Sequence, residues 1–349
     1  MQYLFRLACA ATLPALFWLP LSSAAPALPS LTIEPNSVTL SGLSSGGYMA
    51  HQYHVAYASE IAGAAIFAAG PYRCAGGGYP WNLWRATAVC MDFDDWMPFL
   101  GPPDAADSIQ AAEDEARSGA IDPPQRMSGD RVYLYSGTRD DTVPQTVMNA
   151  LRDYYAHFLL PTDLLYVDRQ GAGHAMVTLD YGGLCGNTAP PYLNDCDYDA
   201  AGAVFEHLYG PMVPPDGDRP EGIVAFDQRL HFPDNDELSL ADVGYLYVPE
   251  SCDQGAVCRL HVAFHGCEQY SERVGDAFYA NAGYNRWAER NNIVVLYPQT
   301  RAGVTLGLWW PNPKGCWDWW GYTGPDYHRR SGRQMRTIKS MIDRLIGRI

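Results

Sequence analysis

Residues 38–47, which read VTLSGLSSGG, determine the fold that we expect for this chain. The stretch reads as a β-strand that runs into a Gly-x-Ser-x-Gly turn and then into a helix. Such a turn brings the backbone close to both the strand and the helix, so small residues are needed on either side of its tip. Gly42 and Gly46 meet that need. The stretch therefore predicts a nucleophile elbow with Ser44 at its tip.

The position of this elbow is as informative as its motif. The α/β-hydrolase fold, which carries such elbows, normally forms several strands before the nucleophile, whereas almost none can precede residue 38 here. The segments that follow alternate between strand-like and helix-like patterns, which predicts a mostly parallel sheet with helices on both faces. The predicted strands are 37–41, 61–69, 131–136, 164–168, 244–248, 260–264 and 293–297, and the predicted helices are 47–58, 108–118, 145–158, 281–291 and 333–346.

Length and composition fit one sizeable domain. The chain has 349 residues, of which 47% are hydrophobic and 18% are charged, and this is enough to bury a large core. We expect a single catalytic domain over residues 26–349. The Pro-rich stretch 210–220 could be a domain linker, but only three clear strands follow it, so we interpret it as a surface connection. The formal net charge of −15 argues against nucleic acid and anionic membranes as partners, and we expect a monomer.

The N-terminus has the pattern of a secretory signal peptide over residues 1–25. Arg6 is its only charge, a hydrophobic run over residues 7–21 follows, and the small residues at 22–25 offer a cleavage site. The run is short for a membrane span, and a retained membrane anchor is the alternative interpretation. We therefore expect a secreted protein, either extracellular or periplasmic.

The cysteines agree with export. Removal of the signal peptide would take Cys9 away and leave eight cysteines, an even number that indicates disulfides in an exported protein. There is no Cys-x-x-Cys spacing, and His261 and His265 would lie roughly 13 Å apart on an extended strand, so we expect neither a metal site nor a cofactor. About 105 pairings are possible; proximity in the sequence suggests Cys74–Cys90, Cys185–Cys196 and Cys252–Cys258, which leaves Cys267 and Cys316 for each other.

A serine nucleophile requires a base and an acid that orients this base, and in α/β-hydrolases the chain order is Ser, acid, His. Two acid candidates follow the predicted strand 131–136 and a Gly turn. Asp140 has the favoured spacing from that turn, whereas Asp141 is expected to cap the helix that begins near Pro144. The base candidate is His174, in the glycine-rich segment that follows the predicted strand 164–168.

The third requirement is an oxyanion hole made of backbone N–H groups. One donor should be the N–H of Ser45, the residue after the nucleophile, and the second should come from a loop after an early strand, often marked by His-Gly. No such loop precedes Ser44, but His265-Gly266-Cys267 appears far downstream. We therefore expect the N–H of Cys267 as the second donor, and we infer that the front half of the fold lies at the back of the chain. The alternative is a buried strand end with a structural cysteine.

These segments together resemble the extracellular poly(3-hydroxybutyrate) depolymerases, in particular the circularly permuted single-domain type and the related type 2 catalytic domains. In non-permuted relatives the His-Gly-Cys, Tyr-Pro-Gln and Asn-Pro-x-x-Cys-Trp segments precede the serine motif, whereas here they follow His174. The resemblance implies a triad of Ser44, Asp140 and His174, an oxyanion hole formed by the amides of Ser45 and Cys267, and a Cys267–Cys316 disulfide. The resembling segments are 40–49, 136–143, 171–178, 190–196, 264–267, 297–299 and 312–322.

The same resemblance implies a secreted esterase that hydrolyses poly(3-hydroxybutyrate) or a related poly(3-hydroxyalkanoate) to oligomers and monomers. The tryptophan-rich loop after residue 308 fits a substrate crevice for an aliphatic polyester, or else a packed aromatic core. From this loop we expect substrate contacts by Trp317, Trp319 and Trp320. Many secreted bacterial members carry a separate polymer-binding domain, and this chain stops at Ile349 without room for one. Binding to a solid polymer is thus expected to use the surface of the catalytic domain itself, and the alternative is a substrate of amorphous granules or soluble oligomers.

Two other functions remain open on the sequence. A feruloyl or acetyl-xylan esterase shares the Gly-x-Ser-x-Gly and His-Gly-Cys layout and is the alternative within enzymes. A non-catalytic polymer-binding protein on a hydrolase scaffold is the alternative of another class, and the intact order Ser, Asp, His argues against it.

Overall fold

The computed structural model describes residues 25–76, 81–91, 101–217, 220, 222–233, 238–303 and 312–349. The segment 1–24 of the predicted signal peptide, with Cys9, lies outside the described residues. Two tryptophans of the tryptophan-rich loop, Trp309 and Trp310, also lie outside them.

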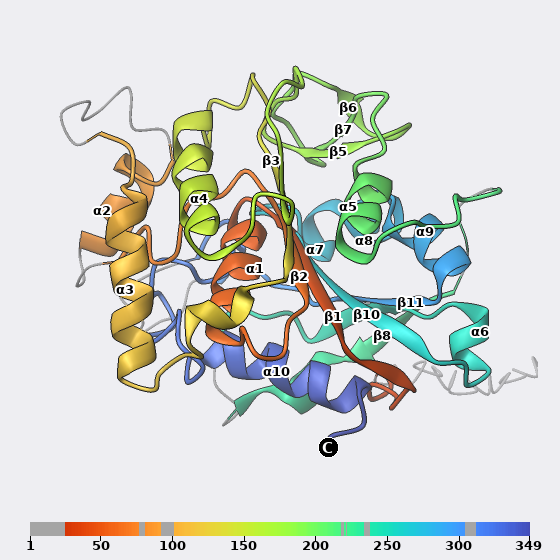
Figure 1. Ribbon diagram of the computed structural model, residues 1–349. Coiled ribbons are helices and arrows are strands. Elements are labelled where there is room, and N and C mark those ends of the chain that lie inside the picture. The colour runs from red at the N-terminus through yellow and green to blue at the C-terminus, as the bar shows by residue number, and fades with distance from the viewer. Residues whose placement is uncertain are drawn as a thin grey trace, which may run out of the picture.

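An eight-stranded sheet runs through the middle of the molecule (Figure 1). Its strands β4, β3, β2, β1, β10 and β11 are parallel, and β9 and β8 continue the sheet in antiparallel pairing. The prediction of a mostly parallel sheet is therefore confirmed. From one edge to the other, the strands are β4 (Leu164–Val167), β3 (Arg131–Tyr135), β2 (Gly63–Phe67), β1 (Ile33–Leu43), β10 (Cys258–Phe264), β11 (Ile293–Tyr297), β9 (Val243–Tyr247) and β8 (Ile223–Asp227).

The order of the strands shows the circular permutation. If the chain is counted from β8, the spatial order from that edge becomes 1-2-4-3-5-6-7-8, and the elbow follows the fifth strand. In the same count β10 is the third strand, and the loop after the third strand is the one that supplies an oxyanion donor in α/β-hydrolases. The segment His265-Gly266-Cys267 follows β10 directly. The predicted α/β-hydrolase fold and its permutation are thus both confirmed.

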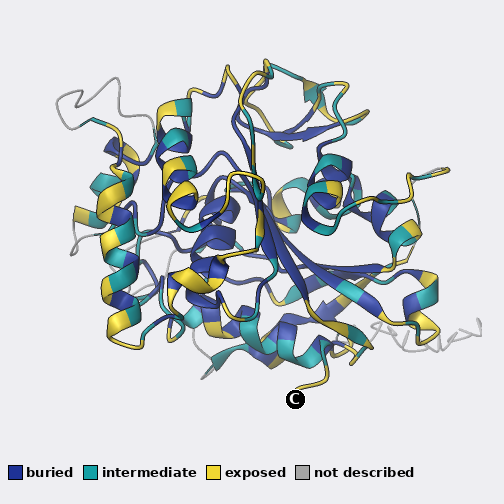
Figure 2. Cartoon of the chain, in the orientation of Figure 1, coloured by how far each residue is buried: buried dark blue, intermediate teal, exposed yellow. Residues whose placement is uncertain are grey.

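The central strands β2, β10 and β11 are buried on both faces, as Figure 2 shows for the middle of the sheet. Successive side chains of β10 alternate between the two sides, as the period of a strand requires. Leu260 and Val262 belong to one hydrophobic cluster, whereas Ala263 belongs to the other. The central strands therefore carry long runs of apolar residues instead of an alternation with polar ones.

Helices cover both faces of the sheet (Figure 1). The helices that contribute most to the first cluster include α1 (Ser45–Ala56), α3 (Ala105–Arg117), α4 (Gln145–Phe158) and α10 (Arg333–Leu345), and those of the second include α5 (Ala200–Tyr209), α8 (Ala277–Asn281) and α9 (Tyr284–Asn291). The remaining helices are α2 (Trp81–Ala88), α6 (Glu250–Asp253) and α7 (Ser271–Val274). Among the described residues, no helix has the length and apolar character that a membrane crossing requires.

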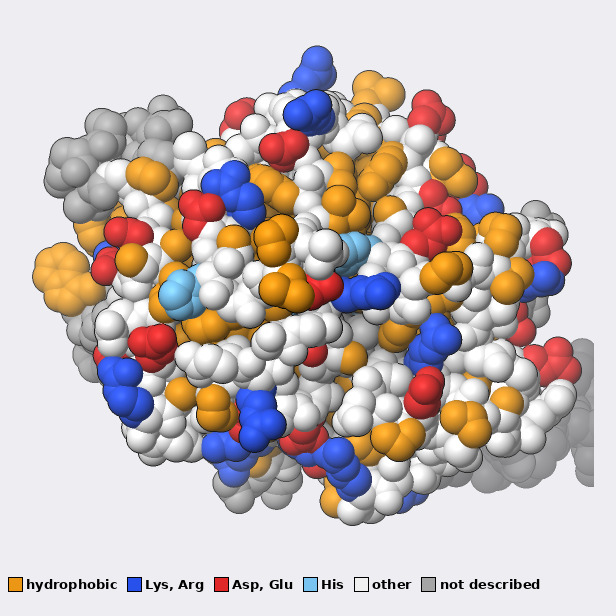
Figure 3. All heavy atoms as spheres, in the orientation of Figure 1, with side chains coloured by type: hydrophobic (Ala, Val, Ile, Leu, Met, Phe, Trp, Pro, Cys, Tyr) orange, Lys and Arg blue, Asp and Glu red, His pale blue; other side chains and the backbone are white. Residues whose placement is uncertain are grey.

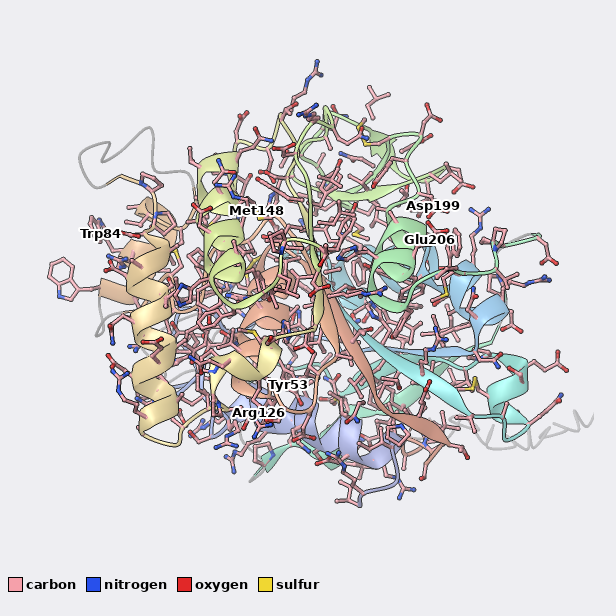
Figure 4. The ribbon with its side chains drawn as sticks, viewed as in Figure 1. Tyr53, Trp84, Arg126, Met148, Asp199 and Glu206 are labelled. Atoms are coloured by element: carbon pink, nitrogen blue, oxygen red, sulfur yellow. A yellow bond between two sulfur atoms is a disulfide. The ribbon has the colours of Figure 1, made fainter. Side chains whose placement is uncertain are left out.

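Side chains on the first face show how these helices are held. Tyr53 of α1 is buried between that helix and α10 (Figure 4). Met148 of α4 points toward the sheet in the same view, and its sulfur accepts a hydrogen bond of 3.1 Å from the Ala69 amide. On the other face, Asp199 begins α5, and its carboxylate accepts hydrogen bonds from the Gly202 amide and from the indole of Trp287. This carboxylate joins α5 to α9.

A second, three-stranded sheet lies above α5 in the view of Figure 1. Its strands pair in the order β5 (Met176–Thr178), β7 (Leu193–Asp195) and β6 (Gly183–Leu184). The Cys185–Cys196 disulfide joins the segments that follow β6 and β7. These strands are too short to produce a readable pattern, and the sequence did not predict them. Their importance is positional, because β5 begins two residues after His174.

Candidate active site

The turn after β1 has the strained geometry of a nucleophile elbow. Ser44 has φ 56° and ψ −123°, a region that residues with a side chain seldom occupy. A Cβ on Gly42 would lie 2.1 Å from the carbonyl oxygen of Gly46, and one on Gly46 would lie 2.3 Å from that of Phe264. Both glycines are therefore required for the close approach of strand and helix. The Ser44 amide donates to the Phe67 carbonyl at 2.9 Å and fixes the turn to β2.

His174 and Asp140 lie side by side, although they are 34 positions apart in the chain. His174 Nδ1 is 2.8 Å from Asp140 Oδ2, and both side chains are buried. The other oxygen of Asp140 accepts hydrogen bonds from the amides of Thr142 and Val143, at 3.0 and 2.8 Å. The His174 amide donates to Thr188 Oγ1 at 2.9 Å. Hydrogen bonds thus fix both Asp140 and His174 in place. When Nδ1 carries the ring proton, Nε2 is available as a base.

The second acid candidate, Asp141, is exposed and is not part of this pair. The expectation that Asp141 caps the following helix is wrong, because α4 begins after Pro144 without a side-chain cap among the described residues. Asp140 itself accepts the two backbone hydrogen bonds of the turn. The carboxylate that orients the imidazole therefore also shapes the loop that carries it.

A cavity of about 170 Å³ brings the predicted site residues together. Ser44 and His174 line it with Gly266 and Cys267, so the serine, the imidazole and the loop after β10 face one space. Ser44 is 8% exposed and His174 is 7% exposed, which makes the site largely shielded from water. The full lining is Leu43, Ser44, Met91, Thr142, His174, Thr188, Tyr192, Gly266, Cys267, Glu268 and Lys314.

Two backbone N–H groups are available at this cavity. Ser45 is the first residue of α1, and the N–H groups of a first helical turn have no partner within their helix. Within the described part of the chain, the Cys267 amide donates no backbone hydrogen bond. These are the two donors that the sequence predicted for an oxyanion hole, and their pairing with a reacting oxygen stays a prediction.

Buried polar side chains hold the loop after β10 in place. His265 Nδ1 lies 2.7 Å from the Gly266 carbonyl, and its Nε2 accepts from the Thr300 amide at 3.1 Å. Burial lowers the pKa of His265 to about 4, so the ring is neutral and can accept at Nε2. Gln269 accepts from the Gly266 amide at 2.8 Å and donates to the carbonyls of Pro191 and Tyr192. The role of Gln269 was not predicted, since no motif marks a glutamine that joins two distant loops.

Among the described residues four disulfides are formed: the three that proximity in the sequence suggested, and the pair of cysteines that these three left over. Cys267–Cys316 ties the loop after β10 to the tryptophan-rich loop over a separation of 49 residues. The other three pairs are Cys74–Cys90, Cys185–Cys196 and Cys252–Cys258. Among the described residues, no group of three or more His, Cys, Asp or Glu side chains is placed to hold a metal ion.

The prediction that Trp317, Trp319 and Trp320 contact substrate needs correction. Trp317 is fully buried and donates from its indole to the His265 carbonyl at 3.1 Å. Trp319 is buried and stacks on Tyr48 with ring centroids 4.0 Å apart, and Trp320 packs against the same core. None of the three lines the cavity at Ser44. Trp317 instead supports the loop after β10 from behind, and Trp319 and Trp320 pack against each other and the hydrophobic core.

The residues that line the rim of the cavity were missed. Glu268 comes directly after Cys267 in the chain, and Lys314 lies two residues before Cys316. No sequence motif marks these residues, because the two loops meet only through tertiary contacts, which include the Cys267–Cys316 disulfide and the hydrogen bond from the Glu268 amide to the Lys314 carbonyl. Proximity to the predicted oxyanion cysteine was the one signal that could have found them.

Comparisons with known proteins agree with this site. No protein-family model matches the chain. A poly(3-hydroxybutyrate) depolymerase of Delftia acidovorans is 40% identical over 324 residues, which cover 91% of this chain and 61% of that relative. A polyhydroxybutyrate depolymerase of Talaromyces funiculosus is 36% identical over 335 residues, which cover 93% of each chain. The chain thus spans less than two thirds of the Delftia relative and nearly all of the fungal one.

Two solved structures are also similar. One is the crystal structure of PHB depolymerase from Penicillium funiculosum, with a TM-score of 0.82. The other is a PHB depolymerase with a serine-to-alanine substitution, complexed with an R3HB trimer, with a TM-score of 0.83. Each is 34% identical to this chain, and the likeness covers 92% of this chain and 99% of the other.

Fold and comparisons together define a carboxylic ester hydrolase of the α/β-hydrolase class that uses a serine. The fungal relative decides the family, since it is aligned over nearly its whole length. The chain belongs to the polyhydroxybutyrate depolymerases, as the sequence motifs predicted.

Proposed function

We propose that this chain is a secreted serine esterase that hydrolyses the ester bonds of poly(3-hydroxybutyrate), with Ser44, His174 and Asp140 as its triad. The observation that carries the proposal is the shared cavity: Ser44 and His174 both line it, and Asp140 lies 2.8 Å behind the imidazole. Family membership supplies the substrate class, and the similar structure that is complexed with an R3HB trimer supports it.

The geometry supports the following reaction. His174 Nε2 takes the proton of Ser44 Oγ as this oxygen attacks the ester carbonyl carbon. The carbonyl oxygen becomes an oxyanion and accepts hydrogen bonds from the amides of Ser45 and Cys267. The carbon–oxygen ester bond then breaks, and the departing alcohol takes the proton from His174. Asp140 keeps the imidazole in the required tautomer and stabilises its cation.

The second half of the reaction regenerates the enzyme. His174 takes a proton from a water molecule, whose oxygen attacks the acyl group on Ser44. The oxyanion forms again in the same hole, and Ser44 leaves with the proton that His174 returns. The product is a carboxylic acid, so every cleavage of the polymer creates one new hydroxyl end and one new carboxylate end.

The lining of the cavity favours a neutral aliphatic ester. Leu43 and Met91 supply apolar surface beside Ser44, and Thr142 and Thr188 supply hydroxyls. On the face drawn in Figure 3, acidic and basic side chains are interspersed instead of being gathered by sign. This distribution does not favour a polyanionic partner such as a nucleic acid.

We further propose that the protein works outside the cytoplasm as a monomer. Four disulfides support an oxidising compartment, since such bonds are kept reduced in the cytosol. Fractionation of expressing cells tests the compartment, and light scattering on the purified protein tests the oligomeric state. Recovery in the cytosol, or a dimer at micromolar concentration, would contradict this part.

The replacement Ser44→Ala tests the reaction. We expect loss of p-nitrophenyl butyrate hydrolysis by at least about 10³-fold, since removal of a triad nucleophile leaves only the oxyanion hole and binding. Ser45→Ala keeps its backbone N–H and should lose far less. Near-wild-type turnover by Ser44→Ala would refute the nucleophile, provided that circular dichroism shows both variants to be folded.

Halo formation on a poly(3-hydroxybutyrate) emulsion tests the substrate. The same preparation should release little ferulate or acetate from feruloylated or acetylated xylan. Release of ferulate or acetate from xylan without a halo on the polyester would instead favour a feruloyl or acetyl-xylan esterase. A folded protein that neither hydrolyses any of these esters nor reacts with a serine-directed phosphonate would favour the non-catalytic binding protein.

A further inference from the structure

A lone ammonium group lies at the cavity of Ser44. The chain holds only two lysines, Lys314 and Lys339, and Lys314 lines this cavity with Ser44 and Cys267. Its side chain is 66% exposed, so the ammonium stands at the mouth of the cavity instead of within the protein. The position is notable in a chain with a formal net charge of −15.

The surroundings of Lys314 leave its hydrogen-bond donors available. Its Nζ lies 3.6 Å from Glu268 Oε2, within ion-pair range but beyond a hydrogen bond. In the described parts of the chain, Nζ forms no hydrogen bond. An ammonium has three donors, and a solvent-exposed pair at this distance satisfies none of them well.

The carboxylate that lines the cavity beside Lys314 also has a cationic partner outside the cavity. Glu268 lies between two cations, because its Oε1 is 3.7 Å from Arg273 Nη2 and its Oε2 faces Lys314. Tyr192 also donates to Oε2 of Glu268 at 3.4 Å. Of these two cations, Lys314 lines the cavity and Arg273 does not, so Arg273 competes from outside with Lys314 for the same carboxylate.

The backbone of Lys314 is firmly placed. Its carbonyl accepts a hydrogen bond of 2.7 Å from the Glu268 amide, and the Cys267–Cys316 disulfide joins the same two loops. The ammonium is therefore carried on a fixed base beside the oxyanion loop, although its own side chain is exposed.

We propose that Lys314 binds the terminal carboxylate of a short hydroxyalkanoate chain and so directs the enzyme toward the acid end of oligomers. This inference rests on the proposed function. The interior of a polyester is neutral, and only the acid end of a chain carries a negative charge. When the ester bond nearest the acid end lies at Ser44, only the last hydroxyalkanoate unit separates the scissile ester oxygen from the terminal carboxylate. Lys314 lines the same cavity as Ser44 and is the cation that we assign to that carboxylate.

The first test compares two forms of one substrate, the 3-hydroxybutyrate trimer as free acid and as methyl ester. The wild type should show a higher kcat/KM for the acid, by about fivefold, which corresponds to about 1 kcal/mol for an exposed ion pair. The difference should lie in KM and should shrink as ionic strength rises, because salt screens exposed charges. Lys314→Gln should abolish the preference, Lys314→Glu should reverse it, and Lys314→Arg should restore it.

Lys339→Gln is the matched control, since it removes the other lysine. Lys339 lies on α10 and pairs with Asp343 and Glu60, away from the cavity. This variant should keep the wild-type preference. A Lys314→Gln enzyme that still prefers the acid, or a wild type without preference, would overturn the proposal.

The second test needs no turnover. In the Ser44→Ala variant, a hydrophilic amine-reactive ester should label Lys314, and mass spectrometry can follow its rate with Lys339 as internal reference. The free-acid trimer should slow the labelling of Lys314 by about threefold or more at occupancies above two thirds, whereas the methyl ester should not. Equal protection by both forms, or none, would overturn the proposal.

The two tests separate this inference from the proposed function. Hydrolysis of neither trimer would refute the polyester substrate, and the labelling experiment would still decide whether Lys314 binds carboxylates. Hydrolysis of both trimers at equal rates would keep the esterase and refute the role of Lys314.

Discussion

His174 Nδ1 lies 2.8 Å from Asp140 Oδ2, and Oδ1 of the same carboxylate accepts the amides of Thr142 and Val143. One aspartate thus both orients the imidazole and closes the turn that follows β3. Oδ2 contacts the imidazole and Oδ1 accepts the backbone amides. A substitution can therefore change the contact with His174 and leave the turn intact.

Asp140→Asn should lower kcat strongly while the fold is kept. An asparagine oxygen can still accept from the two amides, but its NH₂ group facing Nδ1 would favour the wrong tautomer. In a serine protease this change costs about 10⁴-fold in kcat, and we expect a loss of similar order in p-nitrophenyl butyrate hydrolysis. Asp141→Asn is the control and should stay within a few-fold of wild type. The reverse ranking would assign the acid to Asp141.

Gly46→Ala should impair both stability and activity. The added Cβ would lie 2.3 Å from the carbonyl oxygen of Phe264, so α1 must shift away from β10. Overpacking of this kind costs roughly 1–3 kcal/mol or more in the free energy of unfolding, which urea titration can measure. Gly217→Ala meets nothing within 4 Å and should change little. Equal stability of the two variants would contradict the close approach.

Acid should destabilise the protein through His261. This ring lies between Thr39 Oγ1 and Ser41 Oγ, at 2.8 Å from each, and burial lowers its pKa to about 3. The unfolded chain takes up the proton near its ordinary pKa of about 6.5, whereas the folded protein does not. Below that pH the unfolded state binds more protons, so the free energy of unfolding falls as the pH drops from about 6.5 to about 3.

His261→Gln should make this dependence shallower. One such histidine contributes up to about 1.4 kcal/mol per pH unit within the window. Urea titrations at several pH values between 4 and 7 would measure the slope, and His157→Gln on the exposed side of α4 is the control. A slope unchanged by His261→Gln would show that the ring is not buried neutral.

The Cys267–Cys316 disulfide should matter for activity as well as for stability. By loop length, its removal costs about 4 kcal/mol, against about 2 kcal/mol for Cys252–Cys258, whose separations are 49 and 6 residues. Only the first bond holds the oxyanion loop. Below the unfolding temperature, Cys267→Ala/Cys316→Ala should therefore lose at least about tenfold in kcat/KM, short of the 10²–10³ for a missing oxyanion donor.

The Cys252→Ala/Cys258→Ala variant should lose stability but retain most of its kcat/KM. Near-UV circular dichroism would establish that both double variants are folded before activity is compared. Equal losses of kcat/KM in the two would mean that the first disulfide acts through global stability alone.

Local chemistry explains what could be predicted from the sequence. The elbow depends on glycines at fixed spacing, and the chain order of Ser44, Asp140 and His174 is itself a signature. The helix 145–158 and the strand 293–297 were predicted with the bounds that the structure has, because each has a strong pattern. Short-range disulfides follow from proximity along the chain.

What could not be predicted depends on distant contacts. Whether a tryptophan is buried or lines a crevice is decided by what packs over it, and Trp317 is covered by the loop that holds His265. Lys314 lies at the cavity through tertiary contacts, namely the Cys267–Cys316 disulfide and the hydrogen bond from the Glu268 amide to its own carbonyl. The two-residue strand β6 has no pattern to read, since its pairing with β7 is a tertiary contact.

The permutation also changes the order in which the sheet can assemble. During synthesis β1 can pair with β2 early, but its other neighbour β10 arrives more than 200 residues later, as the Thr39–His261 bond spanning 222 positions illustrates. The strand that ends at the centre of the sheet therefore spends most of synthesis as an exposed edge, the situation in which nascent chains aggregate. The proposed oxyanion donor Cys267 is likewise synthesised more than 200 residues after Ser44, so the proposed hydrolytic site is completed late in synthesis.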